Sequence, residues 1–123
     1  MEFRIKDSMP IWQQLADQIT ESIVTGEFPP GERFPAVREL AMTADVNPNT
    51  MQRALAKLEE KGLLVTARTA GRTVTEDEGV LQEMRRQLAE RKTADYMEGM
   101  KKLGYSREEA AAWAADFGKE GEI

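Results

Sequence analysis

Apolar residues recur at helical spacing along the first half of the chain and predict three helices. The first spans about residues 10–25, where apolar side chains three or four positions apart form one face. The second, residues 36–44, is short and follows a proline that favours a first helical turn. The third begins at the capping residue Asn47 and ends before Gly62. The two later helices, joined by a short connection, have the helix-turn-helix pattern.

The second half predicts a hairpin and then two more helices. β-prone runs at 63–66 and 73–75 flank a turn segment with two arginines, so the hairpin has a basic tip. A long helical pattern begins at Val80 and stops at Gly104. Ser106, with Glu109 three residues later, forms a capping box for a last helix.

These elements predict a mainly α fold with a small β hairpin. We expect a winged helix-turn-helix DNA-binding domain in residues 1–76 and a helical dimerisation tail in residues 77–123. The tail is too short for a core of its own, so its apolar side chains are expected to be exposed in one chain and buried against a second copy. The alternative is that the tail helices fold back on their own domain. The side chains concerned are Leu81, Met84, Leu88, Met97, Met100, Trp113 and Phe117.

Composition narrows the chemistry. The chain has no Cys and no His, which excludes disulfides, thiolate nucleophiles, imidazole bases and Cys/His metal sites. The acidic residues are scattered along amphipathic helices, so we expect neither an enzyme nor a cofactor or metal. No apolar run is long enough for a membrane span and no signal peptide is present, so we expect a cytoplasmic protein, at the nucleoid when bound to DNA.

Charge is distributed unevenly. The formal net charge is −5, which argues against nucleic-acid binding by the whole surface. Residues 33–72, however, contain seven basic and four acidic residues. The excess of positive charge therefore lies in the helix-turn-helix and hairpin segment, where double-stranded DNA would bind.

Polar residues off the apolar stripe of the third helix are the candidate base contacts. Amide, hydroxyl and guanidinium groups there suit base edges or phosphates in the major groove. Asn47 has an alternative role, because capping alone is sufficient reason for an asparagine at a helix start. These residues are Asn47, Asn49, Thr50, Gln52 and Arg53.

Phosphate or minor-groove contacts are expected from Arg38 and from the hairpin tip. Each arginine taken alone also fits a solvated surface position. Their grouping around one candidate recognition helix favours DNA contact. The tip residues are Arg68, Thr69, Ala70, Gly71 and Arg72.

Several motifs, spread over about residues 3–76, resemble the GntR family of bacterial regulators. They are Pro10-Ile11-Trp12-Gln13-Gln14-Leu15, Gly26-Glu27-Phe28-Pro29-Pro30-Gly31-Glu32, Phe34-Pro35-Ala36-Val37-Arg38-Glu39-Leu40-Ala41, Val46-Asn47-Pro48-Asn49-Thr50-Met51, Arg53-Ala54 and Leu58-Glu59-Glu60-Lys61-Gly62-Leu63-Leu64. The Val-Asn-Pro-Asn-Thr stretch and the short two-helix tail resemble the YtrA-like branch. The predicted hairpin of residues 63–75 is the wing of this fold. It departs from the family pattern, because Thr69 replaces a glycine and Arg72-Thr73-Val74 replaces Thr-Phe-Val.

The resemblance implies a winged-helix repressor whose Arg38, recognition-helix start and wing tip touch DNA. We expect a homodimer on a near-palindromic operator, controlling its own operon and a neighbouring transporter. A release signal is required, but the sequence shows no effector site. The alternative is a winged-helix module that binds another protein and not DNA; it predicts an acidic or apolar third-helix face, which this sequence lacks.

Overall fold

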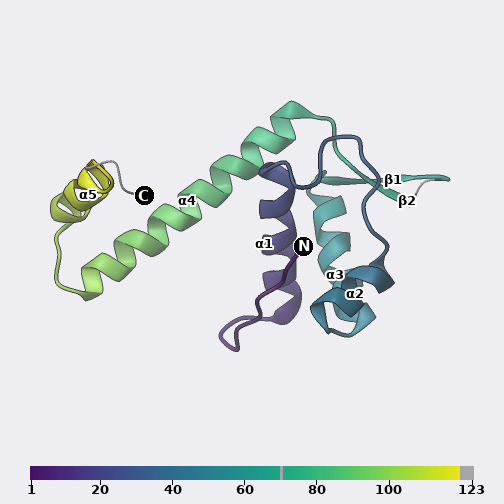
Figure 1. Ribbon diagram of the computed structural model, residues 1–123, viewed down its shortest axis with the longest axis horizontal. Coiled ribbons are helices and arrows are strands. Elements are labelled where there is room, and N and C mark those ends of the chain that lie inside the picture. Colours follow the sequence, from purple (N-terminus) through teal and green to yellow (C-terminus); the bar gives the residue numbers. More distant parts are fainter. Residues whose placement is uncertain (70, 120–123) are drawn as a thin grey trace. The chain divides into compact units, whose positions relative to one another are not determined.

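The computed structural model describes residues 1–69 and 71–119. Figure 1 shows its elements in chain order: α1 (Ile11–Val24), α2 (Val37–Ala44), α3 (Pro48–Glu60), β1 (Leu64–Ala67), β2 (Gly71–Val74), α4 (Glu78–Lys102) and α5 (Arg107–Asp116). The expected fold class, mainly α with a small β hairpin, is confirmed. The chain divides into two compact units, Met1–Arg85 and a second that begins at Arg86, so the boundary lies inside α4.

The core of the first unit lies between α1 and α3, which pack side by side (Figure 1). The apolar stripe of α3, expected from its spacing, is buried along its whole length. Ile11 has the spacing of the apolar face of α1, four positions before Leu15, but it is 44% exposed because it lies in the first turn, at the edge of the core. The fully buried larger side chains are Leu15, Ile19, Met51, Leu55, Leu58, Leu63, Leu64 and Val74.

The turn between α2 and α3 is closed by the backbone. Asp45 has a left-handed conformation with φ of 55°, and the amide of Val46 donates to the carbonyl of Ala41 at 3.0 Å. This geometry ends α2 and redirects the chain within two residues. The next residue, Asn47, caps α3 as expected. The helix-turn-helix pattern is therefore present.

The hairpin pairs β1 with β2 in antiparallel register, with Leu64 opposite Val74 and Thr66 opposite Arg72. The segment before α2 also pairs with β2, because the amides of Gly31 and Phe34 donate to the carbonyls of Val74 and Arg72, both at 2.8 Å. This segment covers the free edge of β2, a pairing that the sequence pattern did not indicate.

Two glutamines on α1 bind the extended segment that precedes the helix. The side-chain amide of Gln14 accepts from the backbone N–H of Lys6 at 2.7 Å and donates to its carbonyl at 2.6 Å. Gln18 repeats this arrangement one turn later with Arg4, at 2.9 and 2.6 Å. The two side-chain amides therefore satisfy backbone N–H and C=O groups of this segment that a neighbouring strand would otherwise pair with.

The start of α4 belongs to the first unit. Leu81 and Met84 are buried, with 7% and 8% exposure, and the guanidinium of Arg85 donates to the carbonyl of Val24 at 3.0 Å. Our expectation that Leu81 and Met84 are exposed in a single chain is therefore wrong. The fold-back alternative applies to these first turns of α4, which pack as core of the same chain.

The second unit contains the rest of α4 and α5. The predicted capping box is present, because Ser106 and Glu109 exchange side-chain to backbone hydrogen bonds of 2.9 and 3.1 Å. The hydroxyl of Tyr96 on α4 donates to the carbonyl of Ala110 on α5 at 2.7 Å. Ala110 is 1% exposed. These contacts hold the two tail helices together.

Candidate nucleic-acid interface

The exposed face of α3 carries most of the predicted base-contacting residues. Asn49, Gln52 and Arg53 are exposed and Thr50 is half-buried, while Met51 and Leu55 fix the opposite face in the core. A single rigid helix therefore presents amide, hydroxyl and guanidinium groups within its first two turns. These groups match the donors and acceptors that base edges offer in a major groove.

Asn47 has a structural role in the free protein. Its side-chain oxygen accepts a hydrogen bond from the backbone N–H of Asn49 at 2.7 Å, which satisfies one of the unpaired donors at the helix start. The capping alternative raised by the sequence is therefore observed. The side-chain NH₂ group of this exposed residue takes no part in the cap, so the two roles are compatible.

Arg53 contacts a side chain that the sequence analysis did not select. Its guanidinium carbon lies 4.4 Å from the ring centroid of Trp12, in the first turn of α1. This is a cation–π distance. Trp12 is half-buried at the end of the apolar stripe of α1. Its spacing from Leu15 indicated a core residue, and no local pattern predicts a contact across 41 positions of sequence.

Arg38 lies in the first turn of α2 with an exposed side chain. A helix start carries unpaired N–H groups and positive potential, so an arginine there adds to an environment that favours phosphate. A shallow depression beside it is lined by residues of α2 and of the turn that leads to α3, among them Met42 and Val46.

The carboxylate of Glu59 on α3 binds both strands of the wing. Glu59 accepts from the Nε of Arg72 at 2.7 Å and from the hydroxyl of Thr66 through its other oxygen. The hydroxyl of Thr66 is the main cause that lowers the pKa of the Glu59 carboxyl; Arg72 lowers it further, and partial burial opposes both. Arg72, predicted as an exposed phosphate contact, is only 19% exposed at its side chain because of this pairing.

The remaining wing residues are more accessible. Arg68 and Thr69 are exposed, and Gly71 has a φ of 71°, which favours glycine at the turn into β2. Ala70, also predicted to contact DNA, lies outside the described residues. Within the described part of the tip, Arg68 therefore presents the accessible positive charge.

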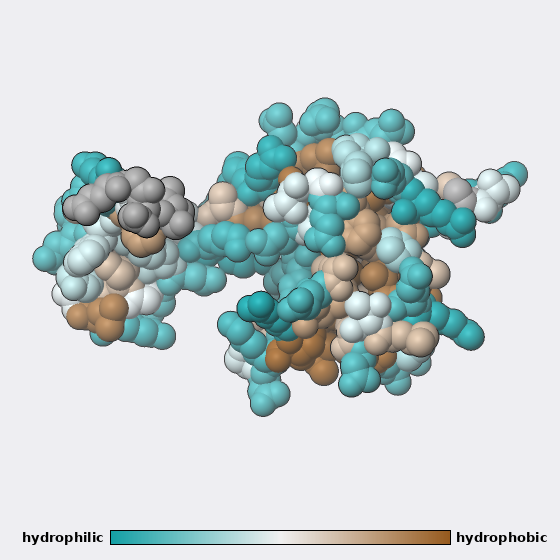
Figure 2. Space-filling model, viewed as in Figure 1, coloured by the Kyte–Doolittle hydropathy of each residue, from teal (hydrophilic) through white to brown (hydrophobic). Residues whose placement is uncertain are grey.

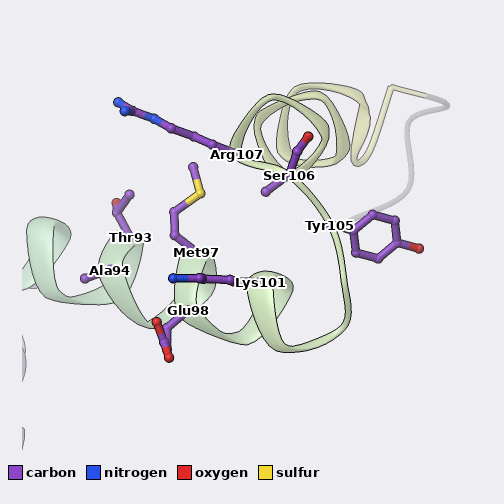
Figure 3. A pocket seen from close by; sticks show the side chains of 9 residues that line it. Thr93, Ala94, Met97, Glu98, Lys101, Tyr105, Ser106 and Arg107 are labelled. Atoms are coloured by element: carbon purple, nitrogen blue, oxygen red, sulfur yellow. The ribbon is translucent and has the colours of Figure 1, made fainter.

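A second surface lies on the tail helices. Trp113 and Phe117, one turn apart, are 55% and 73% exposed, whereas Leu88, Met97 and Met100 are half-buried. Figure 2 shows hydrophobic residues at the surface of the second unit. A cleft of about 740 Å³ between α4 and α5 is lined by Met97, Lys101 and Arg107 among others. Figure 3 shows the side chain of Met97 on α4 pointing toward α5.

Two classes of site are missing from the part of the chain that the structure describes. Its carboxylates nowhere gather in a group of three that could hold a metal ion. None of its helices combines the length and apolar character needed to cross a membrane. The first unit instead presents a polar and basic face of α3 beside a hairpin.

Comparison with known proteins agrees with this arrangement. The family model described as bacterial regulatory proteins, gntR family, matches residues 11–74. An uncharacterized HTH-type transcriptional regulator of Bacillus subtilis, YhcF, is 36% identical over 109 residues, which cover 89% of this chain and 90% of YhcF. The HTH-type transcriptional repressor YtrA of the same organism is 38% identical over 72 residues, 58% of this chain and 55% of YtrA.

A solved structure extends the likeness to the tail. A GntR family transcriptional regulator from Listeria monocytogenes matches with a TM-score of 0.79 and 38% sequence identity. The match covers 90% of this chain and 97% of the Listeria protein. Sequence and fold therefore agree over nearly the whole length of both proteins.

Proposed function

The chain belongs to the GntR family of bacterial regulatory proteins, and from that membership we propose a repressor that binds a near-palindromic operator as a homodimer. It is a DNA-binding transcription regulator of YtrA-like type and not an enzyme. The observation that carries the proposal is the exposed face at the start of α3. This face contains Asn49, Gln52 and Arg53, and no acidic residue lies in the first two turns of the helix.

In the proposed complex the start of α3 enters the major groove. Gln52 and Asn49 have the amide geometry that pairs with adenine, and Arg53 reaches a guanine edge or a phosphate. Arg38 and the wing position the protein on the DNA backbone. The proposed contact set is Arg38, Asn47, Asn49, Thr50, Gln52, Arg53, Arg68, Thr69, Ala70, Gly71 and Arg72.

The tail supplies the proposed dimer contact. Trp113 and Phe117 are large, apolar and exposed, and half-buried methionines lie on the neighbouring helix. A second copy that covers these side chains removes them from water without any other partner. Two recognition helices related by a two-fold axis would then lie in successive major grooves, roughly 34 Å apart. Leu81 and Met84 are left out of this interface because they are buried within one chain.

Repression is favoured by the likeness to YtrA, which is named a repressor, although the chain spans about half of that protein. We propose that the regulated genes include the chain's own operon and a transporter. The site of action would be the bacterial cytoplasm, at the nucleoid, because operator DNA lies there.

A random-site DNA selection with the full chain tests the proposal. We expect an inverted repeat, bound by a dimer, whose affinity falls when salt is raised. Arg53→Ala should weaken binding by about 1–3 kcal/mol if it contacts a base, or lower the salt slope by about one if it contacts a phosphate. Lys61→Ala, at the other end of the same helix, removes an equal charge and should leave affinity nearly unchanged.

Absence of any enriched sequence at low salt, with the protein folded, would contradict sequence-specific recognition by the free protein. Binding of an enriched single half-site by a monomer would contradict the homodimer. An unchanged affinity of Arg53→Ala would remove this residue from the contact set.

A further inference from the structure

Trp12 and Arg53 come from different helices but form one unit on the surface of the first domain. We propose that Trp12 is a positioning residue for DNA recognition, which holds the Arg53 guanidinium in its binding orientation before DNA arrives. The inference rests on the proposed function, in which Arg53 contacts DNA. It assigns a recognition role to α1, which contributes no residue to the proposed contact set.

The geometry leaves Arg53 able to bind while it is held. The guanidinium carbon lies 4.4 Å from the ring centroid of Trp12. A cation–π contact uses the face of the ring and the positive charge, whereas the hydrogen-bond donors of guanidinium lie at the edge of its plane. Among the described residues no carboxylate or carbonyl accepts from these donors. The donors are thus available to a phosphate or a base edge.

Other arginines of the proposed interface are not held in this way. Arg72 is paired with a carboxylate, which competes with phosphate for the same donors. Arg38 and Arg68 are exposed. Trp12 therefore restricts Arg53 with a neutral surface, which adds no negative charge near the DNA and consumes no donor.

Restriction matters because arginine has many rotamers. Fixing a long side chain at an interface lowers affinity, and a side chain that is already ordered loses less freedom on binding. Residues of the stable core supply the rigidity, since Leu15 and Met51, near Trp12 and Arg53 on their helices, are fully buried. The expected benefit of the contact is roughly two- to tenfold in operator affinity.

Trp12 also covers the edge of the core, so a loss of affinity on its removal alone would not separate the two roles. A double-mutant cycle does. Trp12→Leu keeps an apolar side chain but has no aromatic face, and Trp12→Phe keeps the face. Each is made in the wild-type and Arg53→Ala backgrounds, and binding of the full chain to its selected operator is measured with thermal melts of every variant.

We expect Trp12→Leu to weaken operator binding about two- to tenfold in the wild-type background, Trp12→Phe to stay near wild type, and Trp12→Leu to have little effect once Arg53 is alanine. Equal losses in both backgrounds would overturn the inference, because they would show that Trp12 acts through the fold. Unchanged affinity in Trp12→Leu would overturn it as well.

Failure of the proposed function gives a different result. In that case the wild-type chain selects no operator, or Arg53→Ala binds the operator as well as wild type does. If Trp12→Leu does not fold, Trp12→Met replaces it in the same two backgrounds, because methionine covers the edge of the core with a flexible apolar side chain but has no aromatic face. Trp12→Met should lose affinity in the wild-type background and have little effect once Arg53 is alanine. Equal losses in the two backgrounds, or unchanged affinity in the wild-type background, would overturn the inference.

Discussion

Glu59 on α3 and Arg72 on β2 form a hydrogen-bonded ion pair of 2.7 Å that joins the recognition helix to the wing. The same carboxylate accepts from Thr66, which lies directly opposite Arg72 in the hairpin register. One side chain of α3 therefore binds both strands at the same level. This contact therefore adds to the buried Leu64 and Val74 in holding the hairpin against α3.

Replacement of Glu59 by glutamine should loosen the wing. The amide of glutamine can still accept from Arg72 and donate to the hydroxyl of Thr66, but it carries no charge, so the charge-assisted hydrogen bond with Arg72 becomes a weaker neutral one. Because the pair is partly exposed, we expect the free energy of unfolding to fall by only about 1 kcal/mol, as measured by urea denaturation. Glu60→Gln is the control, since Glu60 is exposed and its contact with Lys57 is 3.5 Å long. Equal effects of the two substitutions would contradict the role of Glu59.

The same carboxylate makes part of the stability depend on pH. The pKa of Glu59 is lowered in the folded chain, chiefly by Thr66 and then by Arg72, so the unfolded chain binds its proton more readily. The stabilisation is therefore complete above the unfolded pKa, about 4.3, and is lost as the pH falls through the lower pKa of the folded chain. The difference in unfolding free energy between wild type and Glu59→Gln should shrink over this acidic range. A difference that stays constant down to the lowest pH measured would show that the carboxylate charge is not responsible.

Local patterns predicted the helices and their caps from the sequence. The spacing of Met51, Leu55 and Leu58 gave the buried face of α3, and the Asn47 cap and the Ser106–Glu109 box are present. Periodicity shows which face of a helix is apolar, and capping chemistry shows where a helix begins. Both depend on residues within a few positions of each other, which explains this agreement.

Contacts between distant residues could not be predicted in this way. Gln14 is polar and does not belong to the apolar face of its helix, yet it is buried and binds the backbone of Lys6. Trp12 and Arg53 each fitted their own helix, and nothing in either helix indicated their contact. Leu81 had the spacing of an apolar tail residue, but spacing does not tell which apolar surface covers it. The sequence therefore shows which face of a helix is apolar, but tertiary packing decides which other surface covers that face.

Leu81 provides a test of how the start of α4 is packed. Because it is buried within one chain, Leu81→Ala should leave a cavity and lower the unfolding free energy by about 2–4 kcal/mol at constant protein concentration. Leu103→Ala removes the same atoms from a side chain that is 74% exposed and should change stability by less than about 0.5 kcal/mol. Stability would be measured by denaturant unfolding. A small effect of Leu81→Ala would show that the first turns of α4 are not part of the core.

The exposed aromatic pair on α5 provides the test of the dimer. Trp113 on α5 and Phe117, the C-cap residue of that helix, lie one turn apart and are both exposed, whereas Tyr96 and Tyr105 are half-buried. Truncation of a large aromatic side chain at the centre of an interface commonly costs more than about 1 kcal/mol, so Trp113→Ala or Phe117→Ala should raise the dimer dissociation constant about tenfold or more. Sedimentation equilibrium measures this constant.

Met42→Ala is the matched control, because Met42 is 83% exposed on α2, outside the tail, and its truncation should leave the dissociation constant unchanged. Operator binding separates the tail from the DNA contacts. If α5 acts through dimerisation, the Phe117→Ala variant should bind a single half-site as wild-type monomer does, and lose only the added affinity that a second half-site provides. An unchanged dissociation constant in both aromatic variants would place the dimer contact elsewhere on the chain. A loss of half-site binding would instead show that α5 affects the DNA-binding unit itself.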